Sequence, residues 1–308
     1  MISVVIATYN GEKFILEQLK SIANQSTLPD EVVITDDYST DNTLKLINEF
    51  MINSKLNITV LNNNVRLGYA KNFERGLLEC NGDYVFLSDQ DDVWYENKVT
   101  YMVSLSKRNP NYSCFLNDTL IVDSNLQPID NITKIDQIKK LGLSNKSFVM
   151  GACCLLKREI LDISLPFPIH ITAHDNWIVE IANELNSCYV TDKVLQFYRR
   201  HDNNESVAVF NSTKPITLFE KCQYLSRVKF QRINKTFDLI SNLILKIDYF
   251  KIKGNTEILI ILNKKLTFHY LRLESIYKRN RYSLAKEYLI GNYKKQMSGF
   301  KSFLIDII

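Results

Sequence analysis

The chain has 308 residues, of which 45% are hydrophobic and 23% are charged. This is the ordinary balance of a globular protein, long enough for one large α/β domain with an appendage. No apolar run approaches the roughly 20 residues that a membrane-spanning helix needs, and residues 2–6 lack the basic stretch that begins a secretory signal. We therefore expect a cytoplasmic protein. Its six cysteines show no metal-binding spacing and should be reduced.

Charge is distributed unevenly along the chain. Residues 214–308 carry 19 Lys and Arg against 7 Asp and Glu, a net +12, so residues 1–213 carry a net −8. From residue 214 onward, apolar residues recur every three to four positions, which predicts two or three amphipathic helices with a break at Gly254-Asn255. The sequence thus predicts a main domain over 1–213 and a basic helical region over 214–308.

Strands and helices alternate through the first hundred residues. The expected elements are a strand over 2–7, a helix over 12–24, a strand over 31–35, a helix capped by Thr40 or Asp41, a strand over 58–61, a helix over 70–79, a strand over 84–87 and a helix over 93–105. This alternation predicts an α/β fold with a mostly parallel sheet flanked by helices. Such sheets bind ligands beyond the carboxyl ends of their strands, so we expect the chemistry in the loops after the first, second and fourth strands.

The strongest local signal is Ser88-Asp89-Gln90-Asp91-Asp92, directly after a predicted strand. Three acids within four residues repel one another, and a divalent cation that also bridges substrate phosphates would remove that cost. A solvated turn with a helix cap explains the same pattern equally well.

Three further segments carry candidate chemistry. Asp36-Asp37 follows the second strand, where a carboxylate can accept a base N–H or a ribose hydroxyl, or simply close a turn. The run from Tyr198 to His201 combines an imidazole that can bind metal with two guanidinium groups suited to a diphosphate, although a solvated basic loop has the same composition. Asp175 precedes a predicted helix over 177–185 and can serve as a proton acceptor, an N-cap or both.

These motifs in this order resemble family 2 glycosyltransferases with the GT-A fold. The resemblance spans residues 1 to about 210 and is carried by Ala7-Thr8-Tyr9-Asn10, Asp36 to Asp41, Asp89 to Asp92, Asp175 and Tyr198 to His201. The segments Ser88 to Trp94 and His174 to Trp177 are similar to the bacterial rhamnosyltransferase-like branch. The resemblance implies a Rossmann-like sheet with a nucleotide-binding half over 1–105, an acceptor-side half over 106–213 and a C-terminal α-helical subdomain.

The resemblance also implies roles for individual residues. Asp175 would be the catalytic base, while Asp91 and His201 would bind a divalent metal, Mn²⁺ or Mg²⁺. The residues that would bind the nucleotide sugar are Thr8, Tyr9, Asn10, Asp37, Lys71, Asp89, Arg199 and Arg200. Tyr38 stands where the family pattern Asp-Asp-Gly-Ser has glycine, so we expect a different turn geometry there.

The implied function is inverting transfer of a sugar from a nucleotide-diphosphate donor, UDP-hexose or dTDP-rhamnose. The acceptor would be a saccharide or a lipid-linked oligosaccharide in bacterial surface polysaccharide synthesis. The segment from Gln196 to Arg200 only approximates the family pattern Gln-x-x-Arg-Trp, which argues against processive synthesis.

Alternatives remain open. A nucleotidyltransferase would begin with a Gly-rich phosphate loop, whereas the first loop here has only Gly11. A sugar-nucleotide-binding protein without transfer activity would not need Asp91, Asp175 and His201 together. The basic residues between Lys278 and Lys301 could rest on an anionic membrane surface, pack on the main domain or form a homodimer. No nucleic-acid-binding motif is present, and we expect no nucleic-acid partner.

Overall fold

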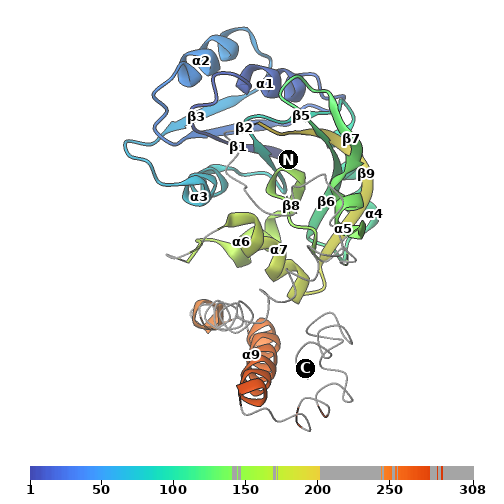
Figure 1. Ribbon diagram of the computed structural model, residues 1–308. Coiled ribbons are helices and arrows are strands. Elements are labelled where there is room, and N and C mark those ends of the chain that lie inside the picture. The colour runs from blue at the N-terminus through green and yellow to red at the C-terminus, as the bar shows by residue number, and fades with distance from the viewer. Residues whose placement is uncertain are drawn as a thin grey trace. The chain divides into compact units, whose positions relative to one another are not determined.

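The computed structural model describes residues 1–140, 144, 147–168, 171, 173–201, 244, 246–251, 254, 256–277, 283 and 286. The chain divides into two compact units, Met1–Lys214 and Pro215–Ile308. The first unit is built on one sheet with the strand order β3-β2-β1-β4-β8-β6-β9-β5, and β7 pairs with β6 beside this path (Figure 1).

The first half of the sheet is parallel throughout. Its strands β1 (Ile2–Thr8), β2 (Glu31–Asp36), β3 (Ile58–Asn62) and β4 (Tyr84–Asp89) lie in the order β3-β2-β1-β4. Helices α1 (Ile15–Ala23) and α2 (Thr43–Asn53) lie on one face and α3 (Tyr69–Glu79) on the other (Figure 1). Because both faces are covered, β1 is apolar almost without interruption. The expected α/β class is confirmed.

The second half of the sheet mixes strand directions. β8 (Cys154–Lys157) pairs antiparallel with both β4 and β6 (Cys114–Val122), while β9 (Cys188–Arg199) runs parallel to β6. β5 (Val93–Trp94) and β7 (Pro128–Thr133) pair antiparallel with β9 and β6. The connecting helices are α4 (Lys98–Arg108), α5 (Lys134–Lys140), η2 (Gly151–Cys153, a 3-10 helix), α6 (Arg158–Ser164) and α7 (His174–Glu184).

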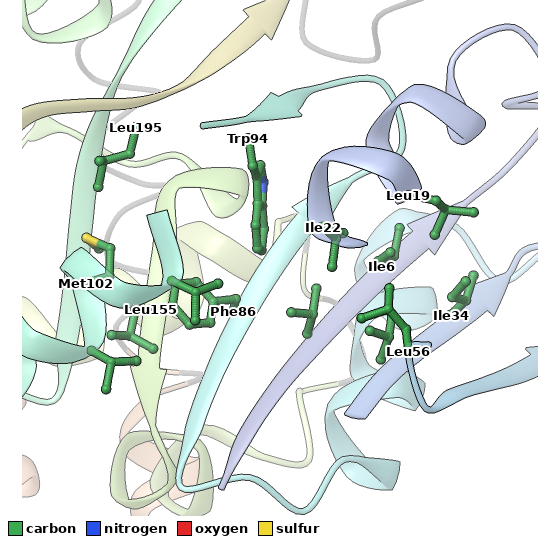
Figure 2. Close-up of a cluster of buried hydrophobic side chains, with 14 of the residues drawn as sticks. Ile6, Leu19, Ile22, Ile34, Leu56, Phe86, Trp94, Met102, Leu155 and Leu195 are labelled. Carbon is green, nitrogen blue, oxygen red and sulfur yellow. The ribbon is translucent and has the colours of Figure 1, made fainter. Parts of the chain in front are cut away.

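One hydrophobic core extends across both halves of the sheet (Figure 2). Its labelled members are Ile6, Leu19, Ile22, Ile34, Leu56, Phe86, Trp94, Met102, Leu155 and Leu195, all of them buried. They come from β1, β2, β4, β5, β8 and β9 and from helices α1 and α4, apart from Leu56, which lies just before β3. Burying one such side chain contributes about 1.5–3 kcal/mol, so this shared core holds the two halves as one platform for the loops above it.

Three predicted element boundaries were wrong. The segment 93–105 begins as strand β5, because Val93 and Trp94 pair with β9, and α4 begins only at Lys98. The helix predicted over 177–185 begins at His174 with Ala173 as its N-cap, so Asp175 lies in the first turn and does not cap the helix. Residues 12–14 form turns, and α1 begins at Ile15.

In the second unit, α9 (Thr256–Tyr277) follows Gly254, whose φ of 67° is a conformation that glycine readily adopts. This places a break at Gly254, as expected. The predicted helix before residue 244, Cys222 and the basic residues from Lys278 onward, except Lys286, lie outside the described residues. Within the described part, no helix is long and apolar enough for a membrane crossing, and the five cysteines present there are unpaired thiols.

Candidate active site

The candidate site lies at the carboxyl ends of β1, β2 and β4. β1 sits between β2 and β4, so the strand order reverses at this point, where open α/β sheets bind their ligands. Thr8 of β1 is in register with Asp36 of β2, and Ala7 with Asp89 of β4. The two acidic motifs of the sequence therefore flank the end of the same central strand.

Asp91 and His201 contact each other at this edge. Nε2 of His201 lies 2.8 Å from Oδ2 of Asp91, and both side chains are mostly buried. The imidazole also stacks on Phe14, with ring centroids 4.8 Å apart. β9 positions His201 at this edge. Arg199, the last residue of β9, is in register with Val122 of β6, and His201 follows two residues later. The structure thus brings the two predicted metal ligands together.

The carboxyl group of Asp89 is affected both by burial and by two neighbouring carboxyl groups. Burial, followed by the charges of Asp91 and Asp175, raises the pKa of Asp89 to about 7, while Lys98 acts in the opposite direction. Asp89 ends β4 and Asp91 follows it, but Asp175 belongs to α7, more than eighty positions later in the chain. Asp175 is hydrogen-bonded to Gly151 of η2, and η2 packs against β4, so distant segments place their acids in one region.

Asp175 is held by backbone groups. Its Oδ2 accepts the N–H of Gly151 at 3.0 Å, and its Oδ1 accepts the N–H of Asn176 at 2.8 Å. A Cβ at position 151 would lie 2.7 Å from Nε2 of His174, so glycine permits the close approach of η2 to α7. The carboxylate of Asp175 is therefore oriented while the residue remains partly exposed, as a general base requires.

The guanidinium group of Arg199 is engaged inside the protein. Its Nε donates to the carbonyl of Asp91 at 2.8 Å, its Nη1 to the carbonyl of Ser124 at 2.6 Å, and its Nη2 forms an ion pair with Glu17. These contacts tie the acidic loop to α1 and to the loop after β6. Of the two arginines predicted to face a diphosphate, Arg200 is the partly exposed one, and this role stays a prediction.

Thr8 and Asp37 order the backbone of the predicted nucleotide pocket. Oγ1 of Thr8 donates to Asp36 at 2.8 Å. The buried carboxylate of Asp37 accepts the backbone N–H groups of Leu67, at 2.6 Å, and Gly68, at 2.9 Å. Both side chains therefore stabilise loops at this edge, and their contact with a nucleotide stays a prediction.

Gln90 holds the backbone of Tyr9 through two hydrogen bonds, which together are called the clamp here. Gln90 belongs to the acidic motif after β4, and the sequence had given it no role. The N–H of Tyr9 donates to Oε1 of Gln90 at 2.9 Å, and Nε2 of Gln90 donates to the carbonyl of Tyr9 at 3.0 Å. A Cβ at Gly11 would lie 2.2 Å from that same Oε1, so glycine leaves room for the clamp. The guanidinium of Arg66 lies 4.0 Å from the centroid of the Tyr9 ring, a cation–π distance.

Asn10 and Tyr38 both adopt left-handed backbone conformations, with φ values of 47° and 66°. Asn10 is stabilised there because its Oδ1 accepts the N–H of Thr40 at 2.9 Å. Tyr38 has a backbone conformation that glycine adopts more readily, and the expectation of a different turn geometry here stays a prediction. The Tyr38 ring is exposed.

Lys71 connects α3 to the segment after α6. Its Nζ donates to Glu74 at 2.6 Å and to the carbonyl of Phe167 at 3.1 Å. Its predicted place near the nucleotide stays a prediction.

A buried network around Lys98 was not expected from the sequence. Nζ of Lys98 donates to the carbonyl of Ala152 at 2.8 Å and to Oε1 of Gln196, whose Nε2 donates to Asp92 at 2.9 Å. Burial lowers the pKa of Lys98 to about 8. Helical spacing could have revealed this lysine, because it precedes Met102 by four positions and therefore lies on the buried face of α4.

The pair Asp91 and His201 fits a divalent cation that completes its coordination elsewhere. A carboxylate oxygen and an imidazole nitrogen are both ligands that Mn²⁺ accepts. Within the part of the chain that the structure describes, no group of three or more His, Cys, Asp and Glu side chains forms a complete metal site. Hard cations commonly take waters and substrate phosphates as further ligands, so two protein donors are consistent with such a site.

Comparison with known proteins identifies the family. The family model described as glycosyl transferase family 2 matches residues 3–163. The dTDP-rhamnosyl transferase RfbG of Shigella flexneri is 32% identical over 215 residues, 65% of this chain and 73% of that protein. The UDP-Glc:alpha-D-GlcNAc-diphosphoundecaprenol beta-1,3-glucosyltransferase WfgD of Escherichia coli is 26% identical over 70% of this chain and 83% of its own length.

A solved structure shares the fold. The mannosyltransferase PcManGT from Pyrobaculum calidifontis, in complex with GDP-Man and Mn²⁺, matches with a TM-score of 0.52 and 17% identity, over 99% of this chain and 85% of that chain. The family model covers the motifs after β1, β2 and β4 that surround the switch in strand order. The chain belongs to glycosyl transferase family 2 and is a glycosyltransferase.

Proposed function

We propose that this glycosyltransferase moves a sugar, with inversion, from a nucleotide-diphosphate donor to a saccharide or lipid-linked acceptor in bacterial surface polysaccharide synthesis. The observation that carries the proposal is the convergence of Asp89, Asp91, Asp175 and His201 at one edge of the sheet. The donors named for RfbG and WfgD support dTDP-rhamnose or a UDP-hexose as the donor. The diphosphoundecaprenol acceptor named for the E. coli relative supports a lipid-linked acceptor here.

Asp175 is the proposed catalytic base. The acceptor oxygen attacks the anomeric carbon and gives its proton to the Asp175 carboxylate, which the N–H of Gly151 holds in place. The new bond from oxygen to the anomeric carbon forms as the bond to the diphosphate oxygen breaks, and the nucleoside diphosphate leaves with the electron pair. Because attack comes from the face opposite the leaving group, the anomeric centre is inverted. A positioned base contributes roughly 10²–10⁴ to the rate of such a step.

Asp91 and His201 would hold the divalent cation, Mn²⁺ or Mg²⁺, which supplies positive charge near the leaving diphosphate. The Mn²⁺ named in the solved mannosyltransferase complex supports this assignment. Arg200, next to His201 in the chain, would add a second positive charge for the same anion.

The basic region 214–308 would keep the enzyme on the cytoplasmic face of a membrane that carries a lipid-linked acceptor. Its net charge supports this, because basic residues near an anionic lipid surface contribute about 1 kcal/mol each. Flotation with vesicles that contain or lack acidic lipid tests it, and equal recovery in both samples would contradict it.

The function is tested with a panel of nucleotide sugars, dTDP-rhamnose and UDP-hexoses first, scored for release of nucleoside diphosphate with and without saccharide acceptors. We expect one donor class to give release that increases with acceptor, and a product whose anomeric configuration is inverted by NMR. Binding without any release would favour a sugar-nucleotide-binding protein. Formation of a nucleotide sugar from a nucleoside triphosphate would favour a nucleotidyltransferase.

A further inference from the structure

Lys98 is a buried cation that the proposed chemistry does not use directly. Its side chain is fully buried, and its Nζ lies 4.1 Å from the centroid of the Trp94 ring. Removing an ammonium group from water is costly unless partners compensate for the lost hydration. Lys98 has such partners in the carbonyl of Ala152 and Oε1 of Gln196. An apolar residue on this face of α4 would avoid this desolvation cost. The hydrogen bonds of Lys98 therefore point to a role for its ammonium group.

The two partners of Lys98 belong to segments that carry the site. Ala152 is the neighbour of Gly151, and the N–H of Gly151 donates to Oδ2 of Asp175 at 3.0 Å. Gln196 belongs to β9, which leads to His201, and its Nε2 donates to Asp92 in the acidic loop. One ammonium group therefore connects the turn that holds Asp175 with the strand and the loop that hold the predicted metal ligands.

We propose that Lys98 is a positioning residue for the catalytic base. Its ammonium group locks the turn at Gly151-Ala152 to β9 and so fixes the backbone N–H that orients Asp175. This inference rests on the proposed role of Asp175 as the base. Lys98 acts through Asp175 and touches no reacting atom.

The chain offers a matched control in Lys157 of β8. Its Nζ also donates to a backbone carbonyl, that of Pro110 at 2.7 Å, and lies 6.0 Å from the centroid of the Phe115 ring. Lys157 also lies 4.0 Å from Oε1 of Glu159, and none of these partners belongs to the acidic loop or contacts Asp175. Lys157→Met removes one such bond and leaves the proposed link unchanged.

The experiment compares Lys98→Met, Lys157→Met, Asp175→Asn and the double variant of Lys98 and Asp175 in the full-length protein. We expect Lys98→Met to lower kcat for sugar transfer by roughly ten- to hundredfold, because a small misplacement of a reacting group has that effect. The affinity for UDP or dTDP, measured by calorimetry, should be unchanged, and Lys157→Met should change neither quantity. In the Asp175→Asn background, Lys98→Met should change kcat by less than about twofold, since both substitutions disable the same group.

Wild-type kcat in Lys98→Met, or the full loss repeated in the Asp175→Asn background, would overturn the inference. Normal turnover of Asp175→Asn alone would instead remove the proposed base, so the two failures are distinguishable. If Lys98→Met does not fold, Gln196→Met breaks the same link from β9 while Lys98 stays in place. It should also lower kcat with nucleotide affinity kept, and normal transfer in that variant would contradict the proposal.

Discussion

His201 lies with its Nε2 2.8 Å from Oδ2 of Asp91, although 110 positions separate the two residues in the chain. Asp91 follows β4 in the first half of the sheet, and His201 follows β9 in the second. Neither half can form the pair alone, so the pair exists only when the complete sheet has assembled. A cation that binds there is consequently linked to the folding of both halves.

Removal of metal should stop sugar transfer. We expect EDTA to abolish release of nucleoside diphosphate and added Mn²⁺ or Mg²⁺ to restore it, because positive charge at the leaving diphosphate lowers the barrier. His201→Ala should raise the metal concentration needed for half-maximal activity by at least about tenfold, the usual effect of disturbing a metal site. Full activity after chelation would remove Asp91 and His201 as ligands.

Asp175→Asn should separate binding from chemistry. The amide keeps the shape of the side chain but cannot accept a proton, so kcat should fall by roughly 10²–10⁴ while the affinity for UDP or dTDP is retained. Steady-state kinetics and calorimetry measure the two quantities. Asp192→Asn, at an exposed position on β9, serves as the control and should behave like the wild type. Near-normal turnover of Asp175→Asn would exclude it as the base.

Asp89 should make the stability of the unliganded protein depend on pH. Its pKa is raised to about 7 in the folded state from an ordinary 3.8, first by burial and then by Asp91 and Asp175. Between these values the folded state binds more protons than the unfolded state, so the contribution of Asp89 to stability falls as pH rises.

Asp89→Asn removes this titration and should raise the thermal unfolding midpoint in EDTA without nucleotide. The gain over the wild type should grow from about pH 4 to about pH 7 and then level off. Thermal unfolding across this range measures it. A gain that stays constant with pH would show that Asp89 keeps an ordinary pKa in the fold.

Gly11→Ala should weaken nucleotide binding without unfolding the protein. The new Cβ would meet Oε1 of Gln90 at 2.2 Å, and because that atom ends a flexible side chain, Gln90 should rotate away and release Tyr9. Gln90→Ala should reproduce the effect by removing the clamp. Calorimetric titration with UDP or dTDP, beside a thermal unfolding curve, checks this. Unchanged affinity in both variants would show that the Tyr9 loop needs no clamp.

The first half of the fold can be predicted well from the sequence, because its strands and helices have regular patterns of apolar residues. β1 is apolar enough to mark a strand buried on both faces, and the helix-forming spacing after it is regular. The acidic motifs could also be located, since they follow strands that must end at the same edge of the sheet.

The second half depends on pairing that no local pattern reveals. Trp94 joins β5 because β9 lies beside it, which overrides the helical pattern of the following residues. The opposite environments of Arg199 and Arg200 follow from the register of β9 on β6, and two adjacent arginines do not encode that register. Gln90, Lys98 and Gln196 have polar side chains that act on segments far away in the chain, so their roles emerge only from the packed structure.

The carboxylate of Asp37 already satisfies the amides of Leu67 and Gly68. Its Oδ2 accepts one hydrogen bond, from Gly68, so a pyrimidine N–H can use the remaining lone pair of that oxygen while residues 63–68 keep their places. Donor capture would then need no rearrangement of that loop. Such an enzyme would bind nucleotide in a single phase, whose observed rate rises in proportion to nucleotide concentration.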